Sequence, residues 1–144
     1  MKFWDSSGLV PLVVREKESE YCLELLSADQ EMVVWCLSRL EVLSALCRQV
    51  REEVIDEALL ASAKKRLDVI LQRAYEVSAL EKVRVRAARL LEVHPIRAAD
   101  ACQLAAALVA TNEDPGRIPL VCFDTRLGAA ARKEGFVVNP VAGE

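Results

Sequence analysis

The amino-acid sequence predicts an α/β fold in which helices cover both faces of a mainly parallel central sheet. Short segments of strand type alternate along the chain with helical segments, in the order strand, helices, strand, several helices, strand, helix, strand. That alternation is typical of parallel strands joined by right-handed helical crossovers. The composition, 53% hydrophobic and 28% charged over 144 residues, belongs to folded proteins. Because no linker or internal repeat interrupts the pattern, we expect one domain over residues 1–144.

The first half of the chain contains two predicted strands, each followed by a helix. Residues 2–5 are bulky and lead through a turn at Ser6, Ser7 and Gly8 into the first helix. Residues 32–36 form an uncharged strand of the buried type, and a second helix is predicted to begin at Ser38. Apolar side chains at steps of three or four then predict a long amphipathic helix from about residue 55 to residue 74.

The second half is predicted to hold three helices and two strands. Apolar periodicity predicts helices over about 79–93 and 97–111, followed by a loop over 112–116. An uncharged strand is predicted over 119–123, and a short helix opens at Asp124 and Thr125. That helix should stop at Gly135, since glycine is favoured just after a helix ends, and 136–138 should return as a strand.

Two aspartates stand where parallel α/β sheets bind ligands, beyond the carboxyl ends of strands. Asp5 follows the first predicted strand and Asp124 follows the strand over 119–123. Each also fits a structural role, because aspartate is a favoured helix N-cap. Glu41 has a structural explanation as well, since Ser38 and Glu41 fit the S-x-x-E capping box.

Asp100 is harder to explain by helix capping. It shares one predicted helix face with apolar residues, so its carboxylate should point inward. The structural alternative is a surface pair with Arg97, three residues earlier. If Asp5, Glu41, Asp100 and Asp124 converge above the sheet, their charges repel unless a cation joins them. Oxygen ligands without histidine or cysteine favour Mg²⁺ or Mn²⁺, and such sites hydrolyse phosphodiesters.

Four segments of the sequence carry the candidate acids in a characteristic order: residues 3–10 (FWDSSGLV), 38–46 (SRLEVLSAL), 97–105 (RAADACQLA) and 121–127 (VCFDTRL). Together they resemble the PIN-domain family, and within it the VapC toxins. Any one of the motifs is weak, but the set is specific, follows the family's order and spacing, and covers essentially the whole chain.

The resemblance implies a three-layer α/β/α endoribonuclease that uses Mg²⁺ or Mn²⁺. It further implies the toxin of a type II toxin-antitoxin system, with RNA as substrate and a small antitoxin as partner. By this resemblance, the family's acidic metal-site positions are matched by Asp5, Glu41, Asp100 and Asp124.

The resemblance also assigns supporting positions and shows two departures from the family pattern. Ser6 matches a hydroxyl residue that supports the first aspartate, and Thr125 is the polar group available just after the last one. Gln103 stands where many relatives carry histidine, and Gly8 where many carry alanine. Neither position is a metal ligand in the family, so the pattern does not imply loss of activity.

The net charge of the chain does not decide whether it binds RNA. The chain has a net charge of −3, whereas binding of a phosphate backbone is driven by Lys and Arg. Lys82, Arg86 and Arg89 share one predicted helix face, which is either an RNA contact or an ordinary solvated surface. Two other function classes are weighed. A non-catalytic PIN-like binding or scaffold module would be favoured by loss of an acid, and a receiver-like phosphoacceptor by adjacent acids after the first strand; neither feature is present.

The remaining expectations concern location, assembly and sulfur chemistry. The longest charge-free run has 12 residues, and the N-terminal residues do not resemble a signal peptide, so we expect a cytoplasmic protein with no membrane span. The apolar face of the helix over 55–74 favours a homodimer. Five dispersed cysteines favour free thiols over disulfides or zinc, and His94, just before Pro95, should mark a helix boundary.

Overall fold

A five-stranded sheet in the order β3-β2-β1-β4-β5 forms the middle layer of the computed structural model, which describes residues 1–141. All neighbouring strands in it are parallel. The chain starts at the centre, runs outward to β3, and then returns to β4 beside β1, so the strand order reverses between β1 and β4. The strands are β1 (Lys2–Trp4), β2 (Met32–Trp35), β3 (Tyr75–Val77), β4 (Leu120–Val121) and β5 (Val138–Asn139).

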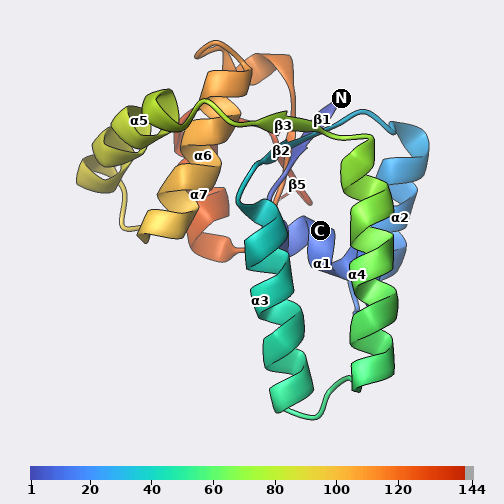
Figure 1. Cartoon of the computed structure of the whole chain (residues 1–144). Helices are drawn as coiled ribbons and strands as arrows, with labels where there is room; N and C mark the ends of the chain where they lie inside the picture. The colour runs from blue at the N-terminus through green and yellow to red at the C-terminus, as the bar shows by residue number, and fades with distance from the viewer. Residues whose placement is uncertain (142–144) are drawn as a thin grey trace.

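Helices form the two outer layers, and the sequence divides them cleanly (Figure 1). The helices before β3 pack on one face of the sheet, and those after β3 pack on the other. On the first face lie α1 (Ser6–Val13), α2 (Ser19–Ala28), α3 (Ser38–Arg51) and α4 (Glu57–Gln72). On the second face lie α5 (Leu80–Val93), α6 (Ala98–Ala110) and α7 (Thr125–Lys133), and a short 3-10 turn spans Pro115–Arg117. The predicted α/β/α architecture is confirmed.

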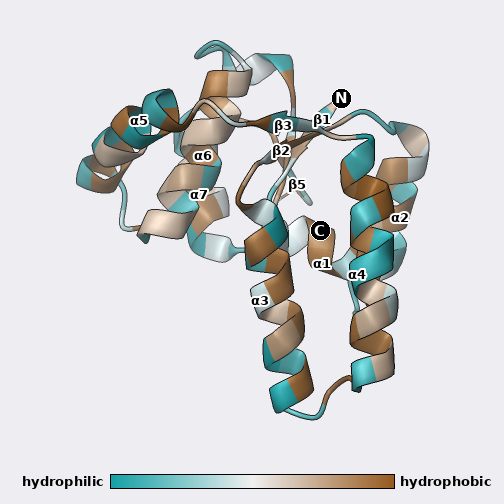
Figure 2. Cartoon of the chain, viewed as in Figure 1, coloured by the Kyte–Doolittle hydropathy of each residue, from teal (hydrophilic) through white to brown (hydrophobic). Residues whose placement is uncertain are grey.

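Alternation along the strands builds two hydrophobic cores. In β1, Phe3 packs with α5, α6 and α7, while its neighbour Trp4 packs with α1 to α4, and both side chains are fully buried. Successive strand residues point to opposite faces, so uncharged strands are needed where both faces are covered. In Figure 2 the strands are mostly brown, and the helices carry brown and teal stripes, as expected for helices with one buried face.

The boundaries of several predicted elements differ from the observed ones. The prediction of a turn from Ser6 to Gly8 is wrong, because α1 begins at Ser6 directly after its N-cap Asp5. The edge strand β3 is absent from the prediction; it has three partly exposed residues, and its spacing merges with the preceding helix pattern. Gly135 does end α7 as predicted, and its positive φ of 104° is a conformation that suits glycine.

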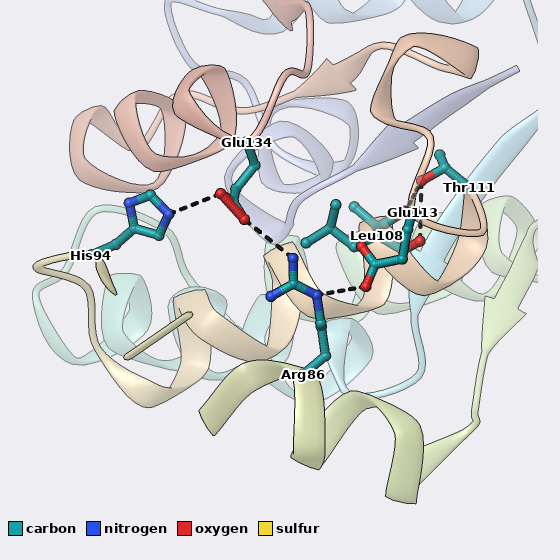
Figure 3. A network of polar contacts seen from close by, with 7 residues as sticks. Arg86, His94, Leu108, Thr111, Glu113 and Glu134 are labelled. Carbon is teal, nitrogen blue, oxygen red and sulfur yellow. Dashed lines mark hydrogen bonds and ion pairs between the residues drawn. The ribbon is translucent and has the colours of Figure 1, made fainter. Parts of the chain in front are cut away.

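The basic face predicted on α5 is partly used by the fold itself. Arg86 binds Glu113, with Nε 2.6 Å from Oε1, and Glu134, with Nη2 3.2 Å from Oε1 (Figure 3). Buried His94, the C-cap of α5 as expected, lies with Nε2 3.3 Å from Glu134 Oε2. These contacts join α5, the end of α7 and the loop after α6. Lys82 and Arg89 remain exposed on the same face.

Two other sequence predictions concern the described part of the chain as a whole. None of the helices within residues 1–141 is long and apolar enough to cross a membrane. All five cysteines are free thiols, and the expectation that they are buried holds for Cys22 and Cys122, whereas Cys36, Cys47 and Cys102 are half-buried.

Candidate active site at the carboxyl edge of the sheet

The four acids singled out from the sequence line one open cavity of about 710 Å³. Asp5 follows β1 and caps α1, and Asp124 lies beyond β4 and caps α7. Glu41 lies in the first turn of α3, and Asp100 lies in the first turn of α6. Because β1 and β4 are the neighbours between which the strand order reverses, this is the place where open α/β sheets bind ligands.

Asp5 is the most buried of the four acids, with 3% of its surface exposed. Its Oδ2 accepts hydrogen bonds from the backbone N–H of Ser7 at 3.1 Å and from the Ser7 hydroxyl at 2.5 Å. The same hydroxyl accepts a bond from the Phe123 amide, 2.9 Å away, so Ser7 ties Asp5 to the chain beyond β4. Burial, together with the charge of Glu41, raises the pKa of Asp5 to about 6 against the lowering effect of the Ser7 bonds.

Glu41 is held by contacts from two other helices. Its Oε2 accepts hydrogen bonds from the Ser6 hydroxyl of α1 at 2.8 Å and from Gln103 Nε2 of α6 at 3.2 Å. The expectation that the Ser6 hydroxyl supports Asp5 is therefore wrong: Ser6 binds Glu41, and the hydroxyl that binds Asp5 is that of Ser7. The capping-box interpretation of Ser38 and Glu41 is wrong, because Ser38 is already the first residue of α3 and its hydroxyl binds Gln103 instead. Burial raises the pKa of Glu41, and the charge of Asp100 adds to that rise.

Asp100 and Asp124 form the more exposed side of the cavity. Asp100 is half-buried at the end of the buried face of α6, as its helix position predicts, and no ion pair joins it to Arg97 within residues 1–141. Burial and then the charge of Asp124 raise the pKa of Asp100, against the lowering effect of the Arg97 backbone and of the charges of Arg97 and Arg126. Asp124 is exposed, and its Oδ1 accepts a hydrogen bond from the Leu127 amide at 2.8 Å, so its predicted capping role is confirmed.

The donor set suits a hard divalent cation. The charge of Glu41 raises the pKa of Asp5, the charge of Asp100 raises the pKa of Glu41, and the charge of Asp124 raises the pKa of Asp100. The four acids are therefore a series of neighbouring like charges. In the described part of the protein, no Lys or Arg forms an ion pair with any of the four. As the side chains lie, no three acidic, thiol or imidazole groups of residues 1–141 already form a metal cluster. Carboxylate oxygens alone are the ligands that Mg²⁺ and Mn²⁺ prefer.

The cavity continues away from the acids along α3. Successive turns of one face of this helix line it with Leu37, Glu41, Ala45, Arg48 and their neighbours. Glu16 also lines the cavity, and its Oε1 accepts a hydrogen bond from Gln49 Nε2 of α3 at 2.9 Å. The rise from Glu41 to Arg48 is about 10 Å, at 1.5 Å per residue. Among the described lining residues, Arg48 is the one with a positive charge, and it makes no ion pair within that part of the chain. The cavity is therefore a groove with the four acids at one end, and with the guanidinium of Arg48 and the carboxylate of Glu16 further along α3.

Other residues named from the sequence lie outside this groove. Thr125, exposed as the first residue of α7, is not among its lining residues. Lys82, Arg86 and Arg89 line a different hollow, between α5 and α6, which shares no residue with the acidic one. In the sequence, Gln103 stands out only as a departure from a family pattern. Its place one helical turn after Asp100 is the signal that could have identified it as a site residue.

Comparison with known proteins agrees with the fold and places the chain in a family. The sequence profile of the PIN domain matches residues 2–133. Two Mycobacterium tuberculosis proteins, ribonuclease VapC45 of strain CDC 1551 / Oshkosh and ribonuclease VapC49 of strain ATCC 25618 / H37Rv, are each 30% identical to this chain over 138 residues. The match covers 96% of this chain and 94% of each relative.

Solved structures share the fold at lower sequence identity. FitAcB from Neisseria gonorrhoeae is 15% identical with a TM-score of 0.66, covering 96% of both chains. PAE2754 from Pyrobaculum aerophilum is 20% identical with a TM-score of 0.63, covering 95% of this chain and 82% of that one. VapBC2 from Rickettsia felis, bound to a DNA fragment from their promoter, gives a TM-score of 0.59 at 15% identity, covering 95% of this chain and 96% of that one. By its sequence, the present chain belongs to the PIN domain family and, within it, to the VapC-type proteins.

Proposed function

We propose that this protein is an endoribonuclease that hydrolyses RNA phosphodiester bonds with Mg²⁺ or Mn²⁺, and that it is the toxin of a type II toxin-antitoxin system. One observation carries the proposal: four carboxylates from four separate elements line a single open groove without a paired cation in the described residues. The names of the two Mycobacterium tuberculosis ribonucleases support the same activity.

The residues that would hold the cation are Asp5, Glu41, Asp100 and Asp124. When bound, such an ion stabilises charge on phosphate oxygens and makes water a stronger nucleophile. Ser7 keeps the Asp5 carboxylate fixed, and Ser6 keeps one Glu41 oxygen fixed. These bonds favour the ionised form of both acids, against the burial that raises their pKa values. The alternative of a non-catalytic binding or scaffold module would be favoured by a missing acid, and all four are present.

The groove along α3 supports RNA as the substrate class. Its open form admits a chain rather than enclosing a small molecule, and Arg48 can bind a phosphate of a nucleotide next to the scissile bond. The acids alone would repel a polyanion, so a cation at their end and a guanidinium at the other give the groove two points of attraction.

Replacing Arg48 with glutamine should weaken RNA binding without slowing the chemistry. An exposed phosphate contact is worth about 0.5–1 kcal/mol, so KM should rise about twofold to fivefold while kcat stays the same. The salt dependence of KM should also become shallower, by about 0.7 in the logarithmic slope. Arg51→Gln is the matched control, since Arg51 is also in the last turn of α3 but does not line the groove. Equal effects of the two substitutions on KM would contradict the assignment of Arg48.

The proposal also includes a small antitoxin as protein partner. The four carboxylates of the groove form no ion pair within the described residues, and they are complementary to an arginine or lysine side chain of an antitoxin tail. Purification after co-expression with a neighbouring small reading frame should therefore give a complex that cleaves RNA more slowly than the free protein. With RNA as its substrate, the protein should act in the cytoplasm.

A homodimer completes the proposed assembly. The helix α4 buries only part of its apolar surface, and Leu59 and Val69 are 52% and 60% exposed. Light scattering of the purified protein at micromolar concentration should give twice the chain mass, and a monomer at that concentration would contradict the dimer.

The direct test of the proposed function is single-turnover cleavage of total cellular RNA by the purified protein. Cleavage should require added Mg²⁺ or Mn²⁺ and should stop when a chelator is added. Cleavage that continues in a chelator would contradict the proposed metal-dependent activity.

A further inference from the structure

Gln103 is a fully buried polar side chain beside the acids. Its exposed fraction is 0%, and its Nε2 donates hydrogen bonds to Ser38 Oγ at 2.9 Å and to Glu41 Oε2 at 3.2 Å. Both partners lie in the first turn of α3, whereas Gln103 lies on α6, one turn after Asp100. A single carboxamide therefore joins the helix that carries Glu41 to the helix that carries Asp100.

The carboxamide is oriented toward Glu41 although this leaves its oxygen without a partner. Gln103 Oε1 is buried and accepts no hydrogen bond from the described residues, which carries a cost in folding free energy. The opposite orientation would direct that oxygen at the Glu41 carboxylate, where two acceptors would repel. The contact with Glu41 thus determines how the Gln103 carboxamide is oriented, although this orientation costs folding free energy at Oε1.

Glu41 needs such a contact because the negative charge of Asp100 repels its carboxylate. The charge of Asp100 opposes ionisation of Glu41, and the groove beside Glu41 is open, so a flexible glutamate could turn away from Asp100. The bonds from Ser6 and Gln103 both fall on Oε2, which leaves Oε1 free of the hydrogen bonds described here. The Gln103 bond therefore fixes one oxygen and presents the other.

We propose that Gln103 is a positioning residue that holds Glu41 ready as a metal ligand and sets its place relative to Asp100. The inference rests on the proposed metal site. Groups that orient metal ligands typically change metal affinity by about tenfold to a hundredfold when they are removed. Gln103 does not contact the ion or the substrate in this proposal; it acts through Glu41.

The test measures Mn²⁺ affinity by titration calorimetry on the full chain, together with the melting temperature of the metal-free protein. Gln103→Met keeps the shape of the side chain and removes both polar atoms, so Mn²⁺ affinity should fall about tenfold to a hundredfold with only a small change in melting temperature. Gln103→His keeps an N–H donor at a similar distance from the backbone and should retain affinity within about threefold. Such a rescue would not follow from a packing role.

Two controls separate positioning from general damage to α6. Thr111→Val removes a buried hydroxyl that bonds only within the end of α6 (Figure 3), and it should leave Mn²⁺ affinity unchanged. In a Glu41→Gln background, the additional change Gln103→Met should have no further effect on affinity. Equal loss in Thr111→Val, or the same loss with and without Glu41, would overturn the inference.

The outcomes also distinguish this inference from the proposed function. A parent protein that binds no Mn²⁺ refutes the metal site itself, whereas a parent and a Gln103→Met variant that bind equally refute only the role of Gln103. Should the methionine variant not fold, the side-chain amide protons of Gln103 in the NMR spectrum of the parent decide the matter. They should shift on Glu41→Gln, and unchanged shifts would overturn the proposed contact.

Discussion

Asp100→Asn should abolish toxicity on expression while leaving the protein folded. Asparagine keeps the shape of the side chain and removes the negative charge that would bind the cation, so RNA cleavage should fall about a hundredfold or more. Without metal, the variant should melt at a slightly higher temperature than the parent, because burial and the charge of Asp124 already disfavour the ionised form of Asp100. Colony counts after induction and melting curves in a chelator measure the two effects.

Asp68→Asn is the matched control for this substitution. Asp68 is an exposed aspartate of α4 that pairs with Arg39 and does not line the groove. Its replacement should leave toxicity intact. If Asp100→Asn remained as toxic as the parent, or if the variant lost its fold, Asp100 would be a structural residue rather than a ligand.

Asp5→Asn should change the pH dependence of stability in the metal-free protein. Burial raises the pKa of Asp5 from its ordinary 3.8 to about 6, so the folded state binds this proton more tightly than the unfolded state does. Because the pKa is higher in the folded state than in the unfolded state, the free energy of unfolding falls as the pH rises from about 4 to about 6 and then stays level. A shift of this size corresponds to an upper limit of about 3 kcal/mol. The asparagine variant should lack this contribution and be more stable than the parent at neutral pH.

The measurement is urea unfolding of parent and variant at several pH values in a chelator. The difference between the two proteins isolates Asp5, because all other titrating groups are common to both. Added Mn²⁺ should stabilise the parent at neutral pH and have little effect on Asp5→Asn, since a ligand stabilises only the folded state that binds it. A difference between the proteins that does not vary with pH would contradict the raised pKa.

Much of the fold could be predicted because its signals are local. The bulky segment that became β1 and the uncharged runs that became β2 and β4 are largely buried, and the long helices α4, α5 and α6 show clear apolar periodicity. The edge strand β3 could not be predicted, since its three residues are too few to establish a period and gain their structure from pairing with β2. Tertiary pairing, and not propensity, makes that segment a strand.

The acids of the site could be predicted from the sequence, but the hydrogen bonds that hold them could not. Asp5 and Asp124 follow strands that a parallel sheet aligns, so their convergence was a consequence of topology. The hydrogen bonds of Ser6 and Gln103 to Glu41 join residues 35 and 62 positions apart, and no local pattern reveals contacts of that kind. For the same reason Ser38 was interpreted as a cap, although its hydroxyl binds another helix.

Single-turnover cleavage of total cellular RNA, with the divalent cation as the variable, tests the central claim most directly. The parent should cleave with Mg²⁺ or Mn²⁺ and stop in a chelator, and Asp100→Asn should cleave at least about a hundredfold more slowly at every cation concentration. Melting temperatures recorded on the same samples show whether both proteins are folded. Equal cleavage by the two folded proteins, or cleavage by the parent that persists in a chelator, would contradict the account of the groove as a metal-dependent ribonuclease site.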